Sequence, residues 1–234
     1  MHQRDSKRSA AGMGRGGMHT VSILIADDHA IVRRGLRTLL ETQPNWKVVA
    51  EASNGREAVE KAAELSPQVA ILDIGMPKLN GMDAATLIFK ANQKTRILIL
   101  TMHAAETLIQ QTLKAGASGY VLKSDAERDL ITAVDAVLHN KTFFTSAASA
   151  VVLEHLRQGQ RKSELLPAGD RLSVREREVV QLLAEGKSNK EIGDSLNISK
   201  RTVDHHRARI MEKLKLQSVG QLVLYAVRNK IVEP

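Results

Sequence analysis

The sequence predicts two folded parts: an α/β domain with a doubly wound, parallel, five-stranded sheet, followed by a small all-α domain. Short apolar runs alternate with amphipathic stretches through residues 20–140, a pattern typical of repeated βα units in a sheet covered on both faces. Residues 171–234 contain several predicted helices that each begin with an N-capping serine. A polar stretch containing Pro167 and Gly169 separates the two patterns. A domain boundary is therefore expected between them.

The apolar runs of the first part predict strands at residues 21–26, 47–52, 68–72, 96–101 and 118–122. Ligands of a parallel sheet bind beyond the carboxyl ends of its strands. Polar and charged side chains stand at those ends, namely Asp27, Asp28, Asp73, Thr101 and Lys123. The sequence therefore predicts one functional site at that edge of the sheet.

Three of these side chains are carboxylates, which repel one another unless a cation lies between them. Mg²⁺ is typically held by one or two carboxylates with water and phosphate oxygens, and a carboxylate beside it can accept a phosphoryl group. Each residue also has an ordinary structural interpretation. The segment Asp27–His29 could open a helix near Ala30, and Asp73 could be a helix cap or a turn residue. Lys123 could be a solvated lysine, and Thr101 could be an ordinary strand end. The joint pattern favours the phosphoryl site.

In this order the residues resemble the bacterial two-component response regulators, whose flavodoxin-like receiver domain carries an acidic pair, a phosphoacceptor aspartate, a threonine or serine, and a lysine. The resemblance covers about residues 21–140. It implies that Asp73 is phosphorylated and that the ligands of Mg²⁺ are Asp27 through water, Asp28, Asp73 and the Gly75 carbonyl. It further implies phosphoryl contacts from Thr101 and Lys123, with Tyr120 as the aromatic that moves inward. Tyr120 could equally be an ordinary core aromatic.

Composition restricts the class of protein. Residues 20–143 hold fourteen Lys/Arg and fourteen Asp/Glu, whereas residues 144–234 hold sixteen against eleven, which indicates a polyanionic partner for the second part. Six aromatic residues are too few to favour a binder that stacks single-stranded bases. Cysteine is absent, which excludes disulfides and thiolate metal sites. No apolar run reaches roughly 18 residues and the start does not resemble a signal peptide, so we expect a cytoplasmic protein with no membrane partner.

Four segments are expected: a disordered tail over residues 1–19, the receiver over 20–140, a linker over 141–170 and the helical domain over 171–234. In the tail, Gly12–Gly17 has the letters of a dinucleotide-binding fingerprint. It follows no strand and precedes one in place of a helix, which argues against nucleotide binding. The linker includes Phe143–Phe144 and an apolar helical stretch around Ala147–Leu156.

Four helices are expected in the second part. Capping boxes are predicted for Ser173 with Glu176, Ser188 with Glu191 and Ser218 with Gln221, and Ser199 is a cap without the reciprocal acid. Gly186 should close the first helix. The short break over residues 196–199 is typical of a helix-turn-helix, whose second helix lies in the DNA major groove.

This second part resembles the LuxR-type, or NarL/FixJ-type, helix-turn-helix DNA-binding domain. The residues concerned are Leu172–Val180, Gly186–Ile192, Ile198–Ser199, Thr202–Val203, His206 and Lys213–Leu214. Together with the receiver, the resemblance implies a phosphorylation-dependent transcription regulator.

On the third helix, helical spacing predicts a buried face of Val203, His206, Ile210 and Leu214, with His206 packed in the core and not a metal ligand. The opposite side is expected to contact DNA through Lys200, Arg201, Asp204, His205, Ala208 and Arg209. Phosphate contacts are expected from Lys187, Asn189 and Lys190. Asp204 departs from the lysine often found in the family; it could accept a hydrogen bond from cytosine N4 or be solvated. Lys200 and Arg201 could also be a solvated face.

The resemblance implies several partners. A sensor histidine kinase would supply the phosphoryl group, and a homodimer formed on activation would bind an inverted-repeat operator in double-stranded DNA. RNA polymerase is a candidate further partner. The protein is not expected to be an enzyme, because a phosphatase or mutase of this chemistry would have a second acid where Gly75 stands. A constitutive DNA-binding protein with an inert receiver is the stronger alternative, although no acidic residue of the site is missing.

Overall fold

The computed structural model describes residues 20–102, 106–145, 148–149 and 172–232. The predicted tail over residues 1–19 lies outside the described residues, as do Gly12–Gly17 and most of the predicted linker and of Ala147–Leu156. The expectations for those segments, and the four domain bounds, stay predictions.

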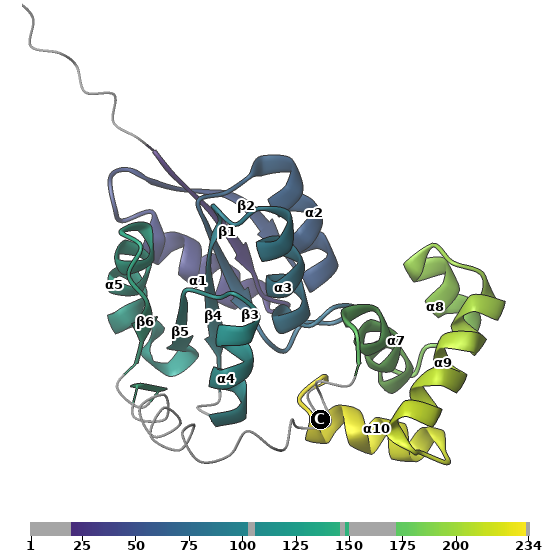
Figure 1. Cartoon of the computed structure of the whole chain (residues 1–234). Coiled ribbons are helices and arrows are strands. Elements are labelled where there is room, and N and C mark those ends of the chain that lie inside the picture. The colour runs from purple at the N-terminus through teal and green to yellow at the C-terminus, as the bar shows by residue number, and fades with distance from the viewer. Residues whose placement is uncertain (1–19, 103–105, 146–147, 150–171, 233–234) are drawn as a thin grey trace, which may run out of the picture.

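The first part contains one sheet in which every strand pairing is parallel, with the order β2-β1-β3-β4-β5-β6 (Figure 1). The strands are β1 Val21–Ala26, β2 Trp46–Ala52, β3 Val69–Asp73, β4 Arg96–Thr101, β5 Gly119–Leu122 and β6 Phe143–Phe144. The five predicted strands are confirmed to within a residue at each end. The prediction of a five-stranded sheet missed the sixth strand, because its two residues are too short to show a strand period and fall within the predicted linker.

Helices cover both faces of the sheet. One face packs against α1 (Ala30–Leu40) and α5 (Ala126–Leu138), around Leu36, Leu130 and Val134. The other packs against α2 (Gly55–Leu65), α3 (Gly81–Ala91) and α4 (Glu106–Lys114), around Ala58, Ile88 and Leu108. A single 3₁₀ turn, η1 (Lys123–Asp125), leads from β5 into α5. Among the described helices, none is long and apolar enough to cross a membrane.

The second part is a bundle of α7 (Val174–Ala184), α8 (Asn189–Leu196), α9 (Lys200–Leu214) and α10 (Val219–Arg228). Its core includes Val179, Ile192, Val203 and Leu222, all fully buried. Because these apolar positions recur at helical spacing, the four helices close around one another and leave their polar sides to solvent.

The helix starts follow the predicted capping chemistry, with one exception. Both glutamate capping boxes are formed, at the starts of α7 and α8, and Ser199 accepts a hydrogen bond from the Thr202 N–H at 3.1 Å. Ser218 caps α10, but the Gln221 side chain accepts from the Gln217 N–H and not from Ser218, so the reciprocal half of that predicted box is wrong. Gly186 ends α7 with φ of +80°, as expected.

Glu57, in the first turn of α2, makes the stability of the fold depend on pH in the acid range. Its carboxylate accepts a hydrogen bond from the Ser53 N–H at 2.8 Å and pairs with Lys61 Nζ at 2.6 Å. Burial alone would raise the pKa of Glu57, but these partners outweigh it and lower the pKa from 4.5 to about 2. A depressed folded-state pKa adds stability above the unfolded value, and this stability is lost as pH falls from about 4.5 through about 2.

We expect Glu57→Gln to lower the free energy of unfolding by about 1 kcal/mol at neutral pH, a figure reduced because solvent screens this half-exposed carboxylate. The difference should vanish in strong acid, where the native carboxylate is protonated too. Urea unfolding across a pH series measures it. Glu64→Gln, an exposed change on the same helix, is the matched control. A Glu57→Gln difference that does not change with pH would contradict the ion-pair explanation.

Candidate functional site

The strand register brings the predicted site residues to one edge of the sheet. Ala26 of β1 pairs with Leu72 of β3, so Asp27 and Asp73 follow side by side. Leu100 of β4 pairs with Asp73, and Thr101 pairs with Leu122 of β5, so that Thr101 and Lys123 complete the row. The site therefore lies at the carboxyl ends of neighbouring strands, where parallel sheets bind ligands.

Lys123 joins the two buried carboxylates. Its Nζ lies 2.8 Å from Asp27 Oδ2 and 2.9 Å from Asp73 Oδ2, and the side chains of Asp27 and Asp73 are 0% and 7% exposed. Burial alone would lower the pKa of Lys123, but the hydrogen bonds to Asp27 and Asp73 outweigh it, and the pKa is raised above its ordinary value. Lys123 is thus a fixed cation beside the proposed phosphoacceptor, and the interpretation as a solvated lysine is wrong.

A second cluster stands at the mouth of the site. His29 Nδ1 lies 2.7 Å from Asp28 Oδ1 and 3.3 Å from Asp27 Oδ1, and one ligand atom from each of these three residues falls within 4.8 Å of the others. Helix α1 does begin at Ala30, but neither carboxylate caps it, since Asp27 Oδ1 accepts from the His29 N–H. The carboxylate oxygens suit a hard cation such as Mg²⁺. The sequence suggested His29 only as part of a helix start and did not predict it as a site residue.

The loop from β3 to α3 is held tightly behind Gly75. The Ile74 carbonyl accepts hydrogen bonds from the N–H groups of Met76 at 2.9 Å and of Gly81 at 3.0 Å. A Cβ at position 81 would collide with the Asp73 carbonyl, so only glycine permits this approach. Gly75 lines the same cavity as Asp28 and Asp73, which is the position expected for a carbonyl ligand of the cation.

Thr101 and Tyr120 are buried at 2% and 0% exposure. Thr101 lies at the end of β4 in the row of site residues, and the ring of Tyr120 is packed inside the core that lies beneath α3 and α4. Both the switch interpretation and the core interpretation of Tyr120 require a buried ring, so its assignment as a switch residue stays a prediction.

Residues of the second part also reach this site. A cavity of about 310 Å³ over Asp73 is lined by Lys123 and Met102 on the receiver side. Its other wall is formed by residues of the helical part, Gln181, Glu185, Lys230, Ile231 and Val232. Sequence reasoning missed these residues because nothing local in α7 or after α10 signals a partner in a distant part of the sequence.

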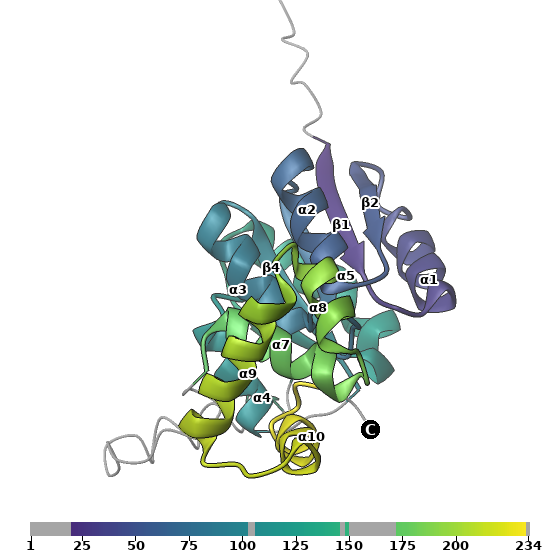
Figure 2. The same ribbon diagram turned by 90° about the vertical axis from the view of Figure 1, so that its right-hand side faces the viewer.

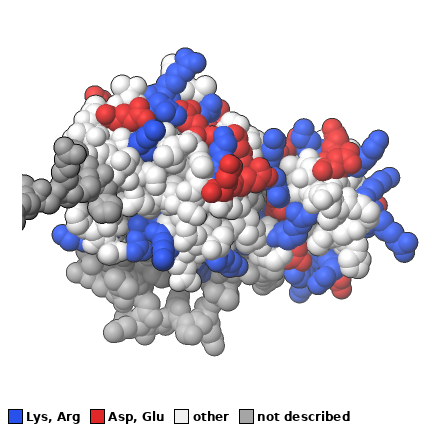
Figure 3. All heavy atoms as spheres, turned by 90° about the horizontal axis from the view of Figure 1, so that it is seen from above, with Lys and Arg blue, Asp and Glu red and all other residues white. Residues whose placement is uncertain are grey.

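The predicted DNA-facing side of α9 is open to solvent. Figure 2 shows α8 and α9 toward the viewer on the side away from the sheet, and Figure 3 shows Lys and Arg projecting from that end of the molecule. The predicted residues are all exposed except Asn189, which is half-buried: Lys187, Asn189, Lys190, Lys200, Arg201, Asp204, His205, Ala208 and Arg209. Asp204 accepts a hydrogen bond from Asn189 Nδ2 at 2.5 Å, which fixes it between α8 and α9.

The opposite side of α9 packs into the core, as expected from its spacing. Val203 and Ile210 are fully buried, and Leu214 packs against the same cluster. His206 is half-buried, and desolvation lowers its pKa, with the positive charge of Arg175 acting in the same direction. A lowered pKa keeps this imidazole neutral, which fits a packing role.

Comparison with known families agrees with both parts of this description. A model of the response regulator receiver domain matches residues 23–135, and a model of the bacterial regulatory proteins of the luxR family matches residues 170–226. The oxygen regulatory protein NreC of Staphylococcus epidermidis is 40% identical over 218 residues, which cover 91% of this chain and all of the relative. NreC of Staphylococcus carnosus is 38% identical over 216 residues, again all of that relative.

Solved structures give the same assignment. A LuxR-family response regulator from Aurantimonas is 35% identical, with a TM-score of 0.56 over 59% of this chain and 99% of that one. The response regulator RcsB solved in complex with DNA is 30% identical, with a TM-score of 0.54 over 88% of this chain and 97% of that one.

Fold, site and relatives define a two-component response regulator, in which a receiver controls an attached DNA-binding domain. The chain belongs to the NarL family of these regulators, with a LuxR-type helix-turn-helix. Its function is phosphorylation-dependent regulation of transcription.

Proposed function

We propose that Asp73 is the phosphoacceptor of this regulator and that the open side of α9 is its DNA-reading surface. The observation that supports the first half most directly is the buried row in which Lys123 Nζ lies 2.9 Å from Asp73 and 2.8 Å from Asp27. Such a row places a nucleophilic oxygen beside a fixed cation and a second carboxylate, which is what phosphoryl transfer requires.

In the proposed transfer, an Asp73 carboxylate oxygen attacks the phosphorus of a phosphohistidine on a sensor kinase. The new P–O bond forms as the P–N bond breaks, and the imidazole leaves with that electron pair. Mg²⁺ bound by Asp27 through water, Asp28, Asp73 and the Gly75 carbonyl would neutralise charge on the phosphoryl oxygens. Lys123 stays beside the Asp73 oxygen and stabilises the same charge from the protein side, and Thr101 contacts the transferred group.

Transmission to DNA follows from these placements. Thr101 ends β4, and Tyr120 lies buried within the adjacent strand β5. In the proposed switch, a shift of Thr101 toward the phosphoryl group changes the packing around the Tyr120 ring. We propose that the resulting state forms a homodimer on an inverted-repeat operator in double-stranded DNA. The protein would act in the cytoplasm, where its kinase and DNA are found, with RNA polymerase as a candidate further partner.

The direct test is to incubate the folded protein with acetyl phosphate and Mg²⁺, then measure its intact mass and its selection of sequences from a random DNA pool. We expect one added phosphoryl group and a recovered inverted repeat that binds more tightly after phosphorylation. A folded protein that gains no mass would contradict the phosphoacceptor assignment. Equal DNA affinity before and after the mass gain would contradict the switch.

Arg201→Ala should weaken DNA binding by a similar factor for every sequence, because Arg201 is an exposed cation at the start of α9, suited to a phosphate contact. We expect the slope of log affinity against log salt to fall by about one unit. Arg128→Ala, which removes an exposed arginine from the receiver, is the control and should change neither affinity nor slope. A loss confined to one operator position would instead assign Arg201 to base reading.

A further inference from the structure

The receiver surface beside Asp73 is an interaction surface for helix α7 of the same chain. Gln181 of α7 is 1% exposed and forms two hydrogen bonds across the interface. Its Nε2 donates to the Met76 carbonyl, and its Oε1 accepts from the Asn80 N–H, both at 2.8 Å. Glu185, one turn later, accepts from the Lys78 N–H at 3.0 Å. Side chains of helix α7 therefore hydrogen-bond to the backbone of the loop between β3 and α3, which contains Gly75.

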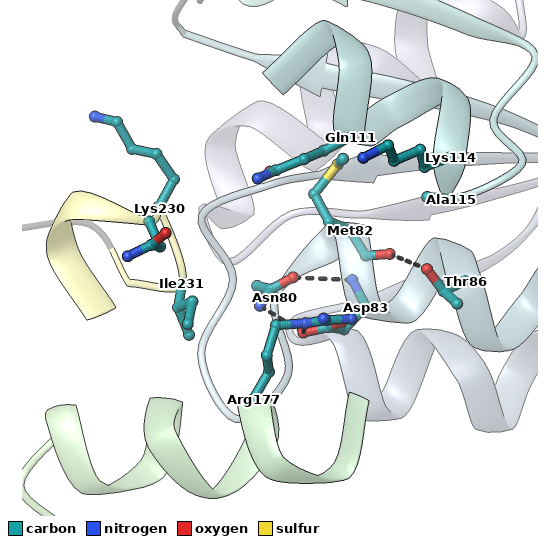
Figure 4. A pocket seen from close by; sticks show the side chains of 11 residues that line it. Asn80, Met82, Asp83, Thr86, Gln111, Lys114, Ala115, Arg177, Lys230 and Ile231 are labelled. Carbon is teal, nitrogen blue, oxygen red and sulfur yellow. Dashed lines mark hydrogen bonds and ion pairs between the residues drawn. The ribbon is translucent and has the colours of Figure 1, made fainter. Parts of the chain in front are cut away.

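An ion pair fixes the neighbouring part of this interface. Arg177 donates to both oxygens of Asp83, at 2.8 and 3.1 Å from its Nε, and Asp83 is 2% exposed. Figure 4 shows Arg177 rising from α7 to Asp83, with Asn80 beside them and Ile231 across a cavity of about 200 Å³. A bidentate, largely desolvated pair of this kind gives a defined orientation as well as attraction.

A second ion pair joins α7 to helix α2 of the receiver. Glu178 of α7, 3% exposed, pairs with Arg56 of α2 and with Arg175 on its own helix. The interface thus uses buried polar groups with matched partners, an arrangement that holds two surfaces in one register.

This arrangement covers the phosphoacceptor and leaves the DNA-facing side open. Gln181, Glu185 and residues 230–232 form one wall of the cavity over Asp73, whose own side chain is 7% exposed. The residues of α9 proposed to read DNA remain exposed in the same arrangement. Docking therefore limits what can reach Asp73 and does not hide the recognition helix.

We propose that α7 and the turn after α10 form a cap that competes with phosphodonors for the Asp73 edge of the receiver. This inference rests on the proposed function of Asp73. Because docking and phosphoryl uptake exclude one another, each must weaken the other to the same extent. A change that weakens the contacts between α7 and the receiver is therefore expected to accelerate phosphorylation of Asp73.

The chain contains no cysteine, so introduced thiols can lock the cap specifically. In Lys78→Cys with Glu185→Cys, a short reducible thiol cross-linker should join the two positions, whose residues are in hydrogen-bond contact. We expect the locked protein to take up phosphate from acetyl phosphate and Mg²⁺ about tenfold more slowly, and reduction to restore the rate. Lys78→Cys with Glu212→Cys, the second an exposed position on α9, is the control pair, and the same treatment should neither cross-link it nor slow its phosphoryl uptake.

The opposite change should release the cap. Arg177→Ala is expected to speed uptake about threefold or more, because the pair with Asp83 helps to hold the domain closed. Arg34→Ala, which removes an exposed arginine of α1 on the other face of the sheet, is the control and should leave the rate unchanged.

The outcomes separate the cap from the site. Equal uptake by locked and reduced protein would overturn the cap while leaving Asp73 as the phosphoacceptor. Absence of the cross-link would overturn the docked arrangement itself. Absence of uptake in every sample, native protein included, would overturn the proposed function of Asp73 and the cap with it.

Discussion

Asp73→Asn is expected to gain no phosphoryl group from acetyl phosphate and Mg²⁺ and to bind operator DNA equally with and without the donor. The amide has nearly the shape of the carboxylate but lacks its negative charge and is a far weaker nucleophile. Lys123 can still donate a hydrogen bond to the amide oxygen that the substitution leaves at position 73, so the fold should persist. The loss should therefore be of chemistry alone, measured by intact mass and by DNA titration.

Asp135→Asn provides the matched control, since it makes the same change on an exposed residue of α5. It should take up one phosphoryl group at the native rate. If Asp73→Asn still gained the group, a neighbouring carboxylate would be the acceptor, and Asp28 would be the first to test because it lines the same cavity.

Lys123→Met should cost both activity and stability. Removing this cation leaves Asp27 and Asp73 buried beside one another with no positive charge between them, and breaking such a buried ion pair costs about 3 to 5 kcal/mol of folding free energy. Phosphoryl uptake should fall by about a hundredfold or more, because charge on the phosphoryl oxygens loses its partner from the protein.

The dependence of stability on pH and on Mg²⁺ distinguishes unpaired carboxylates from a general loss of packing in Lys123→Met. The stability deficit of Lys123→Met should shrink as pH falls, because protonation removes a buried negative charge, and Mg²⁺ should stabilise the variant more than the native protein. Urea unfolding with and without Mg²⁺ measures both, with the exposed Lys47→Met as control. A deficit unaffected by pH and by Mg²⁺ would point to lost packing instead of unpaired carboxylates.

The sequence was sufficient for features that depend on local pattern. Buried parallel strands appear as continuous apolar runs, so five strands could be placed closely, and the polar residues that follow them could be assigned to one edge. The serine and glutamate pairs of α7 and α8 give their helix starts because both halves of the capping box lie within four positions.

What escaped the sequence was set by contacts between distant segments. Gln181 and Arg177 look like ordinary polar positions on a helix, and their partners Asn80 and Asp83 look like an ordinary helix start. Nothing in their spacing indicates that they meet. The predicted capping box at Ser218 failed for a similar reason. The Gln221 side chain accepts its hydrogen bond from the Gln217 N–H and not from the Ser218 N–H.

The short strand β6 decides how the receiver can be studied apart from its DNA-binding domain. Phe143 and Phe144 pair with Gly119 and Tyr120 and so occupy the outer edge of β5. A fragment ending at residue 140 would bare that row of N–H and C=O groups, which is a template for pairing between molecules. A fragment that runs through Thr145 keeps the edge covered, so the choice of end point sets whether the isolated domain stays monomeric or self-associates.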